Sequence, residues 1–221
     1  MPDEPSSCFV YIFKYNIFLF IYKDGLYGYN KTVRRCVILE RFGKPGIIER
    51  FEQLDLDLLA VVGDEKRVEL TIVGSGALIM LNLVGDSRVT TDIDVMETEK
   101  QIEGFLERYD MNQLVSTFLY RLPENWIQRR QRIPFDGIVL DVYAPSNEDL
   151  AILKIDAYRD ADQKDLREMI NGEEINFDRL MTIINNEAEL RVNYADDSEW
   201  EAFLFRLNEI KAFADSMRGQ E

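Results

Sequence analysis

The chain has 221 residues, 46% of them hydrophobic, and is therefore long and apolar enough to bury a sizeable core in one or two domains. It has no histidine and two cysteines, which excludes serine–histidine and cysteine–histidine nucleophiles, histidine-bound zinc and a disulfide framework, and favours a reducing, cytoplasmic setting. Its formal net charge of −15 opposes long-range attraction to nucleic acid but does not exclude a local basic groove.

Residues 1–44 differ in composition from the rest of the chain, and we predict an N-terminal extension of unclear role. Within it, the apolar and aromatic run 8–22 is interrupted by Lys14 and Asn16 and is shorter than the ~20 residues that span a bilayer. An acidic upstream flank and the lack of a small-residue cleavage site argue against a secretory signal, so no transmembrane segment is expected. We predict a strand pair turned near Asp24 and Gly25; a membrane-associating segment and an extension with no stable role are the alternatives.

The spacing of apolar residues predicts the elements of residues 45–145. Pro45 suits the first turn of a helix, and Gly63 ends that helix. Residues 112–135 are ambiguous, because a strand-like stretch precedes a basic cluster. In chain order, the predictions are a helix over 47–62, a strand over 68–73, a buried helix over 76–84, a strand over 91–96, a surface helix over 97–109 and a strand over 137–143.

From residue 146 onward the pattern is helical. Ser146, with Asp149 three residues later, resembles a capping box, and Gly172 is the first glycine or proline that can end this helix. Two further amphipathic helices are predicted over 176–190 and 197–216. The whole order predicts an α+β fold, in which a mixed β-sheet is flanked by helices and followed by a helical C-terminal region.

A glycine–serine turn and a pair of aspartates point to chemistry. Gly74 and Ser75 stand at a predicted strand-to-helix junction, where glycine lets a phosphate approach the backbone and serine adds a hydroxyl. Asp92 and Asp94 share one face of a strand, and two carboxylates placed so repel each other unless a cation lies between them. Mg²⁺ takes oxygen ligands together with substrate phosphates, and two such ions assist displacement at phosphorus. An ordinary tight turn and a solvated strand edge are the plain alternatives for each feature alone.

Asp141 stands alone in an apolar predicted strand. An aspartate buried there without a partner is costly, and a metal ion is one partner that removes the cost. Asp141 is therefore the candidate third carboxylate of a site that contains Asp92 and Asp94.

The order of these features resembles the polymerase-β-type nucleotidyltransferase superfamily, in which a strand, a Gly-Ser turn and a helix precede Asp-x-Asp and a later strand aspartate. Gly85, followed by Arg88, Thr90 and the acidic pair, is similar more narrowly to bacterial minimal nucleotidyltransferases related to AbiEii abortive-infection toxins. Those proteins also carry a lysine–alanine–arginine–aspartate helix, which here reads KIDAYRDADQKDL over 154–166. The resemblance covers roughly residues 45–190 and leaves the N-terminus unexplained.

The second motif gives a geometric expectation. In a continuous helix, Lys154, Tyr158 and Asp165 would share a face, with Asp162 about 80° from Lys154 at ~100° per residue. That face would direct a cation and acids toward the site; an exposed helix with charge pairs three and four residues apart is the alternative. The motif departs from the family pattern at Ala161, where a basic residue is expected.

The resemblance implies a nucleotidyltransferase catalytic core over 45–145 and a helical region over 146–221 that contributes to the site. Asp92, Asp94 and Asp141 would hold two Mg²⁺ ions, or Mn²⁺ in their place, and Asp141 would also help to deprotonate the acceptor hydroxyl. Lys154 would be catalytic by neutralising triphosphate charge. The other implied roles are nucleotide binding by Gly74, Ser75, Arg88, Lys154 and Arg159, and support by Thr90, Tyr158, Asp162 and Asp165.

The implied reaction moves a nucleoside monophosphate from a triphosphate to an acceptor hydroxyl and releases pyrophosphate. The toxin resemblance implies an RNA or tRNA end as acceptor, a toxin–antitoxin or abortive-infection role and an antitoxin partner. Trp126 with Arg129, Arg130 and Arg132 would supply a local RNA surface, with a solvated basic hairpin as the alternative. A small-molecule or protein acceptor, a non-catalytic nucleotide-binding or regulatory module of the same fold, and a two-metal phosphodiesterase stay open.

Overall fold

The computed structural model describes residues 9–13, 17–21, 40–98, 100–113, 121–186, 190–191 and 193–218, and the chain divides into two compact units, 1–40 and 41–221. In the first unit, β1 (Phe9–Phe13) and β2 (Ile17–Ile21) pair antiparallel. The expected strand pair is confirmed, but its connection falls between these strands and not near Asp24 and Gly25, which lie outside the described residues. The apolar run 8–22 is long enough for two strands of 5 residues, because its polar interruptions fall between them.

The second unit is built on a five-stranded mixed sheet with the order β5-β4-β3-β7-β6. Its strands are β3 (Val68–Val73), β4 (Ile93–Thr98), β5 (Met111–Asn112), β6 (Gln131–Arg132) and β7 (Leu140–Ala144). β3 runs parallel to β7 and antiparallel to β4, so the carboxyl ends of β3 and β7 and the start of β4 meet at one end of the sheet.

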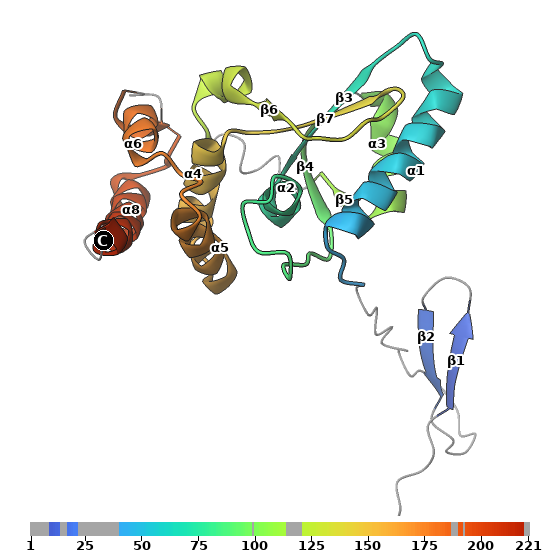
Figure 1. The fold of residues 1–221 in the computed structure, drawn as a ribbon, viewed down its shortest axis with the longest axis horizontal. Helices are drawn as coiled ribbons and strands as arrows, with labels where there is room; N and C mark the ends of the chain where they lie inside the picture. The colour runs from blue at the N-terminus through green and yellow to red at the C-terminus, as the bar shows by residue number, and fades with distance from the viewer. Residues whose placement is uncertain are drawn as a thin grey trace, which may run out of the picture. The chain divides into compact units, whose positions relative to one another are not determined.

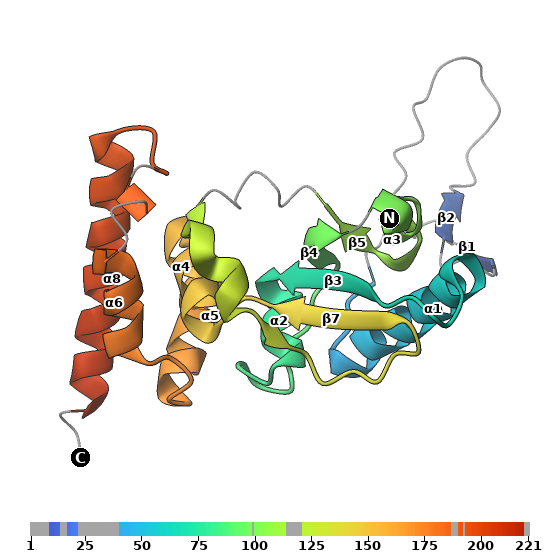
Figure 2. The same cartoon turned by 90° about the horizontal axis from the view of Figure 1, so that it is seen from above.

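The helices of the second unit are α1 (Lys44–Val62), α2 (Gly74–Met80), α3 (Lys100–Leu106), α4 (Asn147–Ala157), α5 (Asp160–Asn171), α6 (Phe177–Asn186) and α8 (Asp197–Arg218), with 3₁₀ turns η1 (Glu107–Tyr109) and η3 (Glu124–Arg129). α1 packs on β7 and α2, and α2 packs on β3 and β4. α4 and α5 stand at the end of the sheet where β3 and β7 finish (Figure 1). α6 and α8 lie on the far side of α4 and α5 from the sheet (Figure 2).

The core follows the sequence pattern. Pro45 occupies the first turn of α1, and Ile47, Phe51, Leu54 and Leu58 have no exposed surface. Their spacing of three and four residues places them on one helix face, and each contributes about 1.5–3 kcal/mol by burial. The predicted α+β class, a mixed sheet flanked by helices and followed by a helical C-terminal region, is confirmed. Within the described residues, no helix has the length and apolar character needed to cross a membrane.

The expected uninterrupted helix after Ser146 is wrong. Ser146 does cap the helix, because its Oγ accepts a hydrogen bond from the Asp149 backbone N–H at 3.2 Å, and Gly172 does end α5. The chain breaks between α4 and α5 at Tyr158, which has the left-handed φ of 45°. Arg159 then starts α5, where its backbone N–H donates to the Asp162 carboxylate.

Other observed boundaries differ from the predicted ones, in part because an apolar stretch is not helical along its whole length. The helix expected over 76–84 begins at Gly74 and ends at Met80, since Asn82 turns the chain with a φ of 57°. Leu83 and Val84 are buried without being helical. β4 extends to Thr98, so the helix expected from residue 97 begins at Lys100, and the ambiguous 112–135 contains β6, η3 and part of β5.

Candidate active site

The Gly-Ser turn and the acidic pair meet at the end of the sheet. Asp94 lies opposite Val73 in the β3–β4 pairing, and its neighbours Ile93 and Val95 are buried in the core. Side chains alternate along a strand, so the carboxylate of Asp94 points to the other face. A Cβ added to Gly74, which has a φ of 64°, would come within 2.3 Å of Asp94 Oδ2. Glycine is therefore required here for both its backbone conformation and the approach of the carboxylate.

Asp92 lies in the loop immediately before β4 and is half-buried. The hydroxyl of Thr90 donates to the backbone carbonyl of Asp92 at 2.9 Å, and the backbone of Thr90 exchanges two hydrogen bonds with Phe42. The hydroxyl of Thr91 donates to Asp92 Oδ1 at 3.4 Å. Thr90, predicted to support the site, shapes the loop that carries Asp92 through these hydrogen bonds.

The break between α4 and α5 brings Lys154 to two aspartates of α5. Its Nζ donates to Asp162 Oδ1 at 2.7 Å and to Asp165 Oδ2 at 2.8 Å. All three side chains are buried. An ammonium group has three donors, so one donor of Lys154 remains for a ligand after these two bonds.

Two arginines extend this cluster in opposite directions. Arg88 pairs with Asp165, with Nε 2.9 Å from Oδ1, and its Nη2 also donates to Ser75 Oγ at 3.0 Å. Arg159 donates from Nε to Asp162 Oδ2 at 2.7 Å, and its side chain is 77% exposed. The structure therefore connects the Gly-Ser turn to the α4–α5 junction through alternating charges.

Protonation of Asp162 follows from these contacts. Burial raises the pKa of Asp162, but the hydrogen bonds from Arg159 and Lys154 outweigh burial and hold the pKa below its ordinary value. The bond to Asp162 in turn raises the pKa of Arg159. Both partners of the pair therefore stay charged.

A cavity of about 300 Å³ lies between the start of β4, where Asp94 stands, and α4. Asp94 and Gly74 line one side of it, and Lys154, Arg159 and Asp162 line another. The α4 face adds an apolar wall, formed by Leu150, Leu153 and Ala157. Sequence reasoning missed this wall, although Leu150 and Ala157, four residues before and three residues after Lys154, lie on its side of a helix.

The described contacts balance the charge of the Asp94 carboxylate only in part. Burial, followed by repulsion from Asp92, raises the pKa of Asp94 to about 6, and the attraction of Lys154 and Arg159 only partly offsets this. Among the described residues, no group forms a hydrogen bond or ion pair with the Asp94 carboxylate. A half-buried carboxylate without a partner, beside a second carboxylate, fits a bound cation.

The carboxylates of Asp92 and Asp94 are ligands of the type that Mg²⁺ prefers, but they are only two. Within the described ranges, no group of three or more His, Cys, Asp or Glu side chains is arranged to hold a metal ion. Mg²⁺ commonly binds one or two carboxylates and completes its octahedron with water and substrate phosphates. Asp92 and Asp94 therefore fit an ion whose remaining ligands come from a nucleotide.

The structure does not bring Asp141 to this site. Asp141 pairs with Glu69 near the start of β3, four residues before Val73, whereas Asp94 lies opposite Val73. Two arginines satisfy its carboxylate, Arg67 with hydrogen bonds of 2.9 and 2.5 Å and Arg132 with one of 2.6 Å. The bonds from Arg67, and to a smaller extent the bond from Arg132, keep the pKa of Asp141 below its ordinary value. The expected third carboxylate thus has guanidinium partners and lies away from the acidic pair.

The predicted RNA surface is also occupied from within the chain. Arg129 forms two hydrogen bonds with Asp149, and Arg130 pairs with Glu69 at 2.7 Å and lies over the ring of Tyr143. Arg132 is bonded to Asp141, and Trp126 is 8% exposed. The three arginines are therefore paired with acidic side chains of the same chain, and Trp126 has little exposed surface on which a base could stack.

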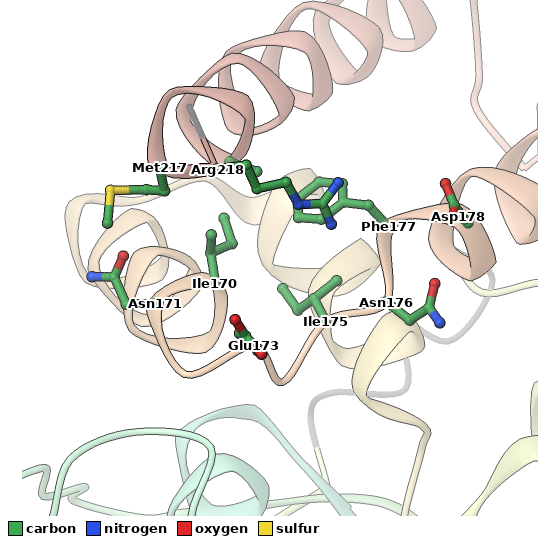
Figure 3. A pocket seen from close by; sticks show the side chains of 10 residues that line it. Ile170, Asn171, Glu173, Ile175, Asn176, Phe177, Asp178, Met217 and Arg218 are labelled. Atoms are coloured by element: carbon green, nitrogen blue, oxygen red, sulfur yellow. The ribbon is translucent and has the colours of Figure 1, made fainter. Parts of the chain in front are cut away.

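A second, larger cavity of about 490 Å³ lies elsewhere, where the ends of α5 and α8 meet the start of α6 (Figure 3). Its apolar lining includes Ile170, Ile175 and Phe177, and the guanidinium of Arg218 lies over the ring of Phe177. None of the predicted site residues lines it. The chemistry-bearing residues gather at the smaller cavity.

Together, the mixed sheet, the Gly-Ser turn into a helix and the acidic pair at the start of the adjacent antiparallel strand define a nucleotidyltransferase-type fold. The chain belongs to the family described as "Nucleotidyltransferase of unknown function (DUF6036)", whose sequence profile matches residues 49–214. Comparisons with curated proteins and with solved structures gave no match. Membership assigns the chain to the transferases at a coarse level and implies a nucleotide substrate. The division into a core over 45–145 and a helical region over 146–221 stays a prediction.

Proposed function

We propose that this protein transfers a nucleoside monophosphate from a nucleoside triphosphate to an acceptor hydroxyl, using Mg²⁺ held by Asp92 and Asp94. The observation that carries the proposal is the Asp94 carboxylate, unpartnered among the described residues and close against Gly74, facing a cavity that Lys154 and Arg159 also line. Bound at the two carboxylates, Mg²⁺ would neutralise phosphate charge and favour attack by the hydroxyl. Asp141 has no part in this site.

The charges around the cavity support a cation-dependent reaction. The lining residues and their charged neighbours comprise four carboxylates and three cations, which leaves one net negative charge: Asp92, Asp94, Asp162 and Asp165 against Arg88, Lys154 and Arg159. A triphosphate carries about four negative charges and would be repelled by that surrounding in the absence of metal. Bound divalent cations reverse the sign of the local charge.

The residues then have separate tasks. Arg159, exposed and bonded through Nε, offers its two terminal nitrogens to phosphate oxygens, and Lys154 offers its remaining donor. Backbone at Gly74 and the Ser75 hydroxyl bind the terminal phosphates, while Arg88 orients Ser75. The acceptor oxygen bonds to the α-phosphorus, the bond from that phosphorus to the bridging oxygen breaks, pyrophosphate leaves, and the hydroxyl proton passes to solvent.

The acceptor is proposed from the resemblance alone. An RNA or tRNA end, or a protein hydroxyl, is the proposed acceptor, with a toxin role in a toxin–antitoxin or abortive-infection system and an antitoxin as partner. The internal pairing of Arg129, Arg130 and Arg132 gives RNA binding at that surface no support.

The test is incorporation of label from each of the four α-labelled triphosphates, with total RNA or total protein and Mg²⁺. We expect transfer by the wild type, loss of about a hundredfold or more in Asp94→Asn, and retention in the matched control Asp141→Asn. Absence of transfer in the wild type with every triphosphate and acceptor refutes the catalytic proposal. Nucleotide binding without transfer would instead favour a regulatory module. Growth arrest on expression that Asp92→Ala abolishes would support the toxin role.

A further inference from the structure

Helix α5 holds the loop that leads to the acidic pair at two points. Residues 81–92 join α2 to β4 and end on Asp92. Glu168 Oε2 accepts a hydrogen bond from the Gly85 backbone N–H at 2.9 Å, and Asp165 pairs with Arg88. Asp165 and Glu168 are three residues apart on one helix and therefore share a face. The two contacts together fasten this face of α5 to the loop.

The two contacts are not equivalent. Asp165 also binds Lys154, so its replacement would disturb the charges of the cavity directly. Glu168 does not line the cavity, and its further ion pair is with Lys164 at 3.9 Å on the solvent side. Glu168 thus offers a way to loosen the loop without touching a residue that faces the cavity.

We propose that Glu168 is a positioning residue for nucleotide binding, an inference that rests on the proposed function. By fixing the backbone at Gly85, Glu168 keeps Arg88 in reach of both Asp165 and Ser75, and keeps Asp92 at the start of β4. The loop between α2 and β4 has no regular secondary structure of its own beyond an isolated bridge at Thr90. When the anchor is lost, the binding-competent loop becomes a smaller fraction of the population, and the apparent nucleotide affinity falls by that fraction.

The experiment compares wild type with Glu168→Ala, Glu168→Gln and Lys164→Ala. Glu168→Ala removes the acceptor of the Gly85 N–H, whereas the amide oxygen of Glu168→Gln accepts the same hydrogen bond. Lys164→Ala removes the solvent-side ion pair and leaves the contact with Gly85, which makes it the matched control. Two properties are measured: amide hydrogen exchange of peptides covering 81–92, and the dissociation constant of each of the four Mg²⁺–nucleoside triphosphates by calorimetry.

In Glu168→Ala we expect exchange in 81–92 to rise and the dissociation constant to increase about fivefold to tenfold, the range of one partly exposed hydrogen bond. Glu168→Gln and Lys164→Ala should match the wild type in both properties. Unchanged exchange in Glu168→Ala overturns the anchoring contact, and raised exchange with unchanged affinity overturns the positioning role. A wild type that binds none of the four triphosphates refutes the proposed function, and the positioning role falls with it even where exchange supports the anchor.

Discussion

Replacing Asp94 with asparagine should stabilise the metal-free protein, and should do so more at pH 7.5 than at pH 4.5. The carboxylate is half-buried beside Asp92, and burial followed by this repulsion raises the pKa of Asp94 from 3.8 to about 6. The folded protein therefore holds the proton more tightly than the unfolded chain does. The associated stability is fully present below the unfolded pKa and is lost as pH rises through the folded pKa.

The size of the effect follows from the shift. A difference of about two pKa units corresponds to about 3 kcal/mol, at 1.36 kcal/mol per unit, once Asp94 is ionised in both states. About 2 kcal/mol of this develops between pH 4.5 and pH 7.5, because the unfolded carboxyl is already largely ionised at the lower pH. Asparagine does not titrate, so the stability of Asp94→Asn relative to wild type should grow by about 2 kcal/mol over this interval.

The assay is urea unfolding with EDTA at both pH values, followed by the fluorescence of Trp126 and Trp200, which both belong to the unit 41–221. Titrating groups that do not interact with Asp94 cancel in the difference between the two proteins. Mg²⁺ at pH 7.5 should then stabilise the wild type and leave Asp94→Asn unchanged, because a ligand stabilises the state that binds it. A stability gap that is equal at both pH values, or larger at pH 4.5, would refute the electrostatic reasoning.

Three further substitutions, one of them with a matched control, test the rest of the structure. Asp141→Asn should lower the free energy of unfolding by on the order of 2 kcal/mol at pH 7, because its bonds with the arginines are lost. This loss should shrink as pH falls, because the wild-type Asp141, whose pKa is lowered in the folded protein, then becomes protonated as well. Urea unfolding at pH 3 that still shows the full loss would contradict this reasoning. Gly74→Ala should abolish Mg²⁺–nucleotide binding in calorimetry, because its Cβ would lie 2.3 Å from Asp94 Oδ2. Gly63→Ala, at φ 73° and ψ 178° with nothing within 4 Å of the added Cβ, should cost about 1–3 kcal/mol in stability through backbone strain and leave binding intact. Ser146→Ala should lower the free energy of unfolding by about 1–2 kcal/mol through the lost helix cap, and an unchanged urea midpoint would count against that cap.

Local patterns predict the central part of the site. The strand over 68–73 is predicted at its observed bounds because β-branched residues end at Gly74, and the faces of Asp94 and its apolar neighbours follow from alternation alone. The cap at Ser146 is equally local. These features depend on residues within a few positions of one another, which a sequence displays directly.

The α4–α5 junction could not be predicted in this way. Along a continuous helix, Lys154 and Asp165 would be about 16 Å apart at 1.5 Å per residue, too far for a lysine side chain to bridge. The left-handed turn at Tyr158 folds α5 back and makes a contact of 2.8 Å. Neither glycine nor proline marks the turn; the hydroxyl of Tyr158 donates to Glu209 on α8, a partner 51 residues away. The sequence motif identified the charged residues, but their geometry depends on long-range packing.

The prediction of Asp141 as a metal ligand rests on a physical rule that is itself correct. A buried carboxylate does need a cation, but a guanidinium meets that need as well as a metal ion does. Arg67 is 74 residues away in sequence, so nothing near Asp141 indicates this partner. The two aspartates therefore differ in their bonded partners. Asp141 is paired with arginines within the fold and has a lowered pKa, whereas Asp94 has no bonded partner among the described residues and a raised pKa. A cation binds most favourably to a carboxylate that has no other positive partner. The acidic pair Asp92 and Asp94 is therefore the favoured site of metal-dependent chemistry, and the nucleotide would supply the remaining ligands of the ion.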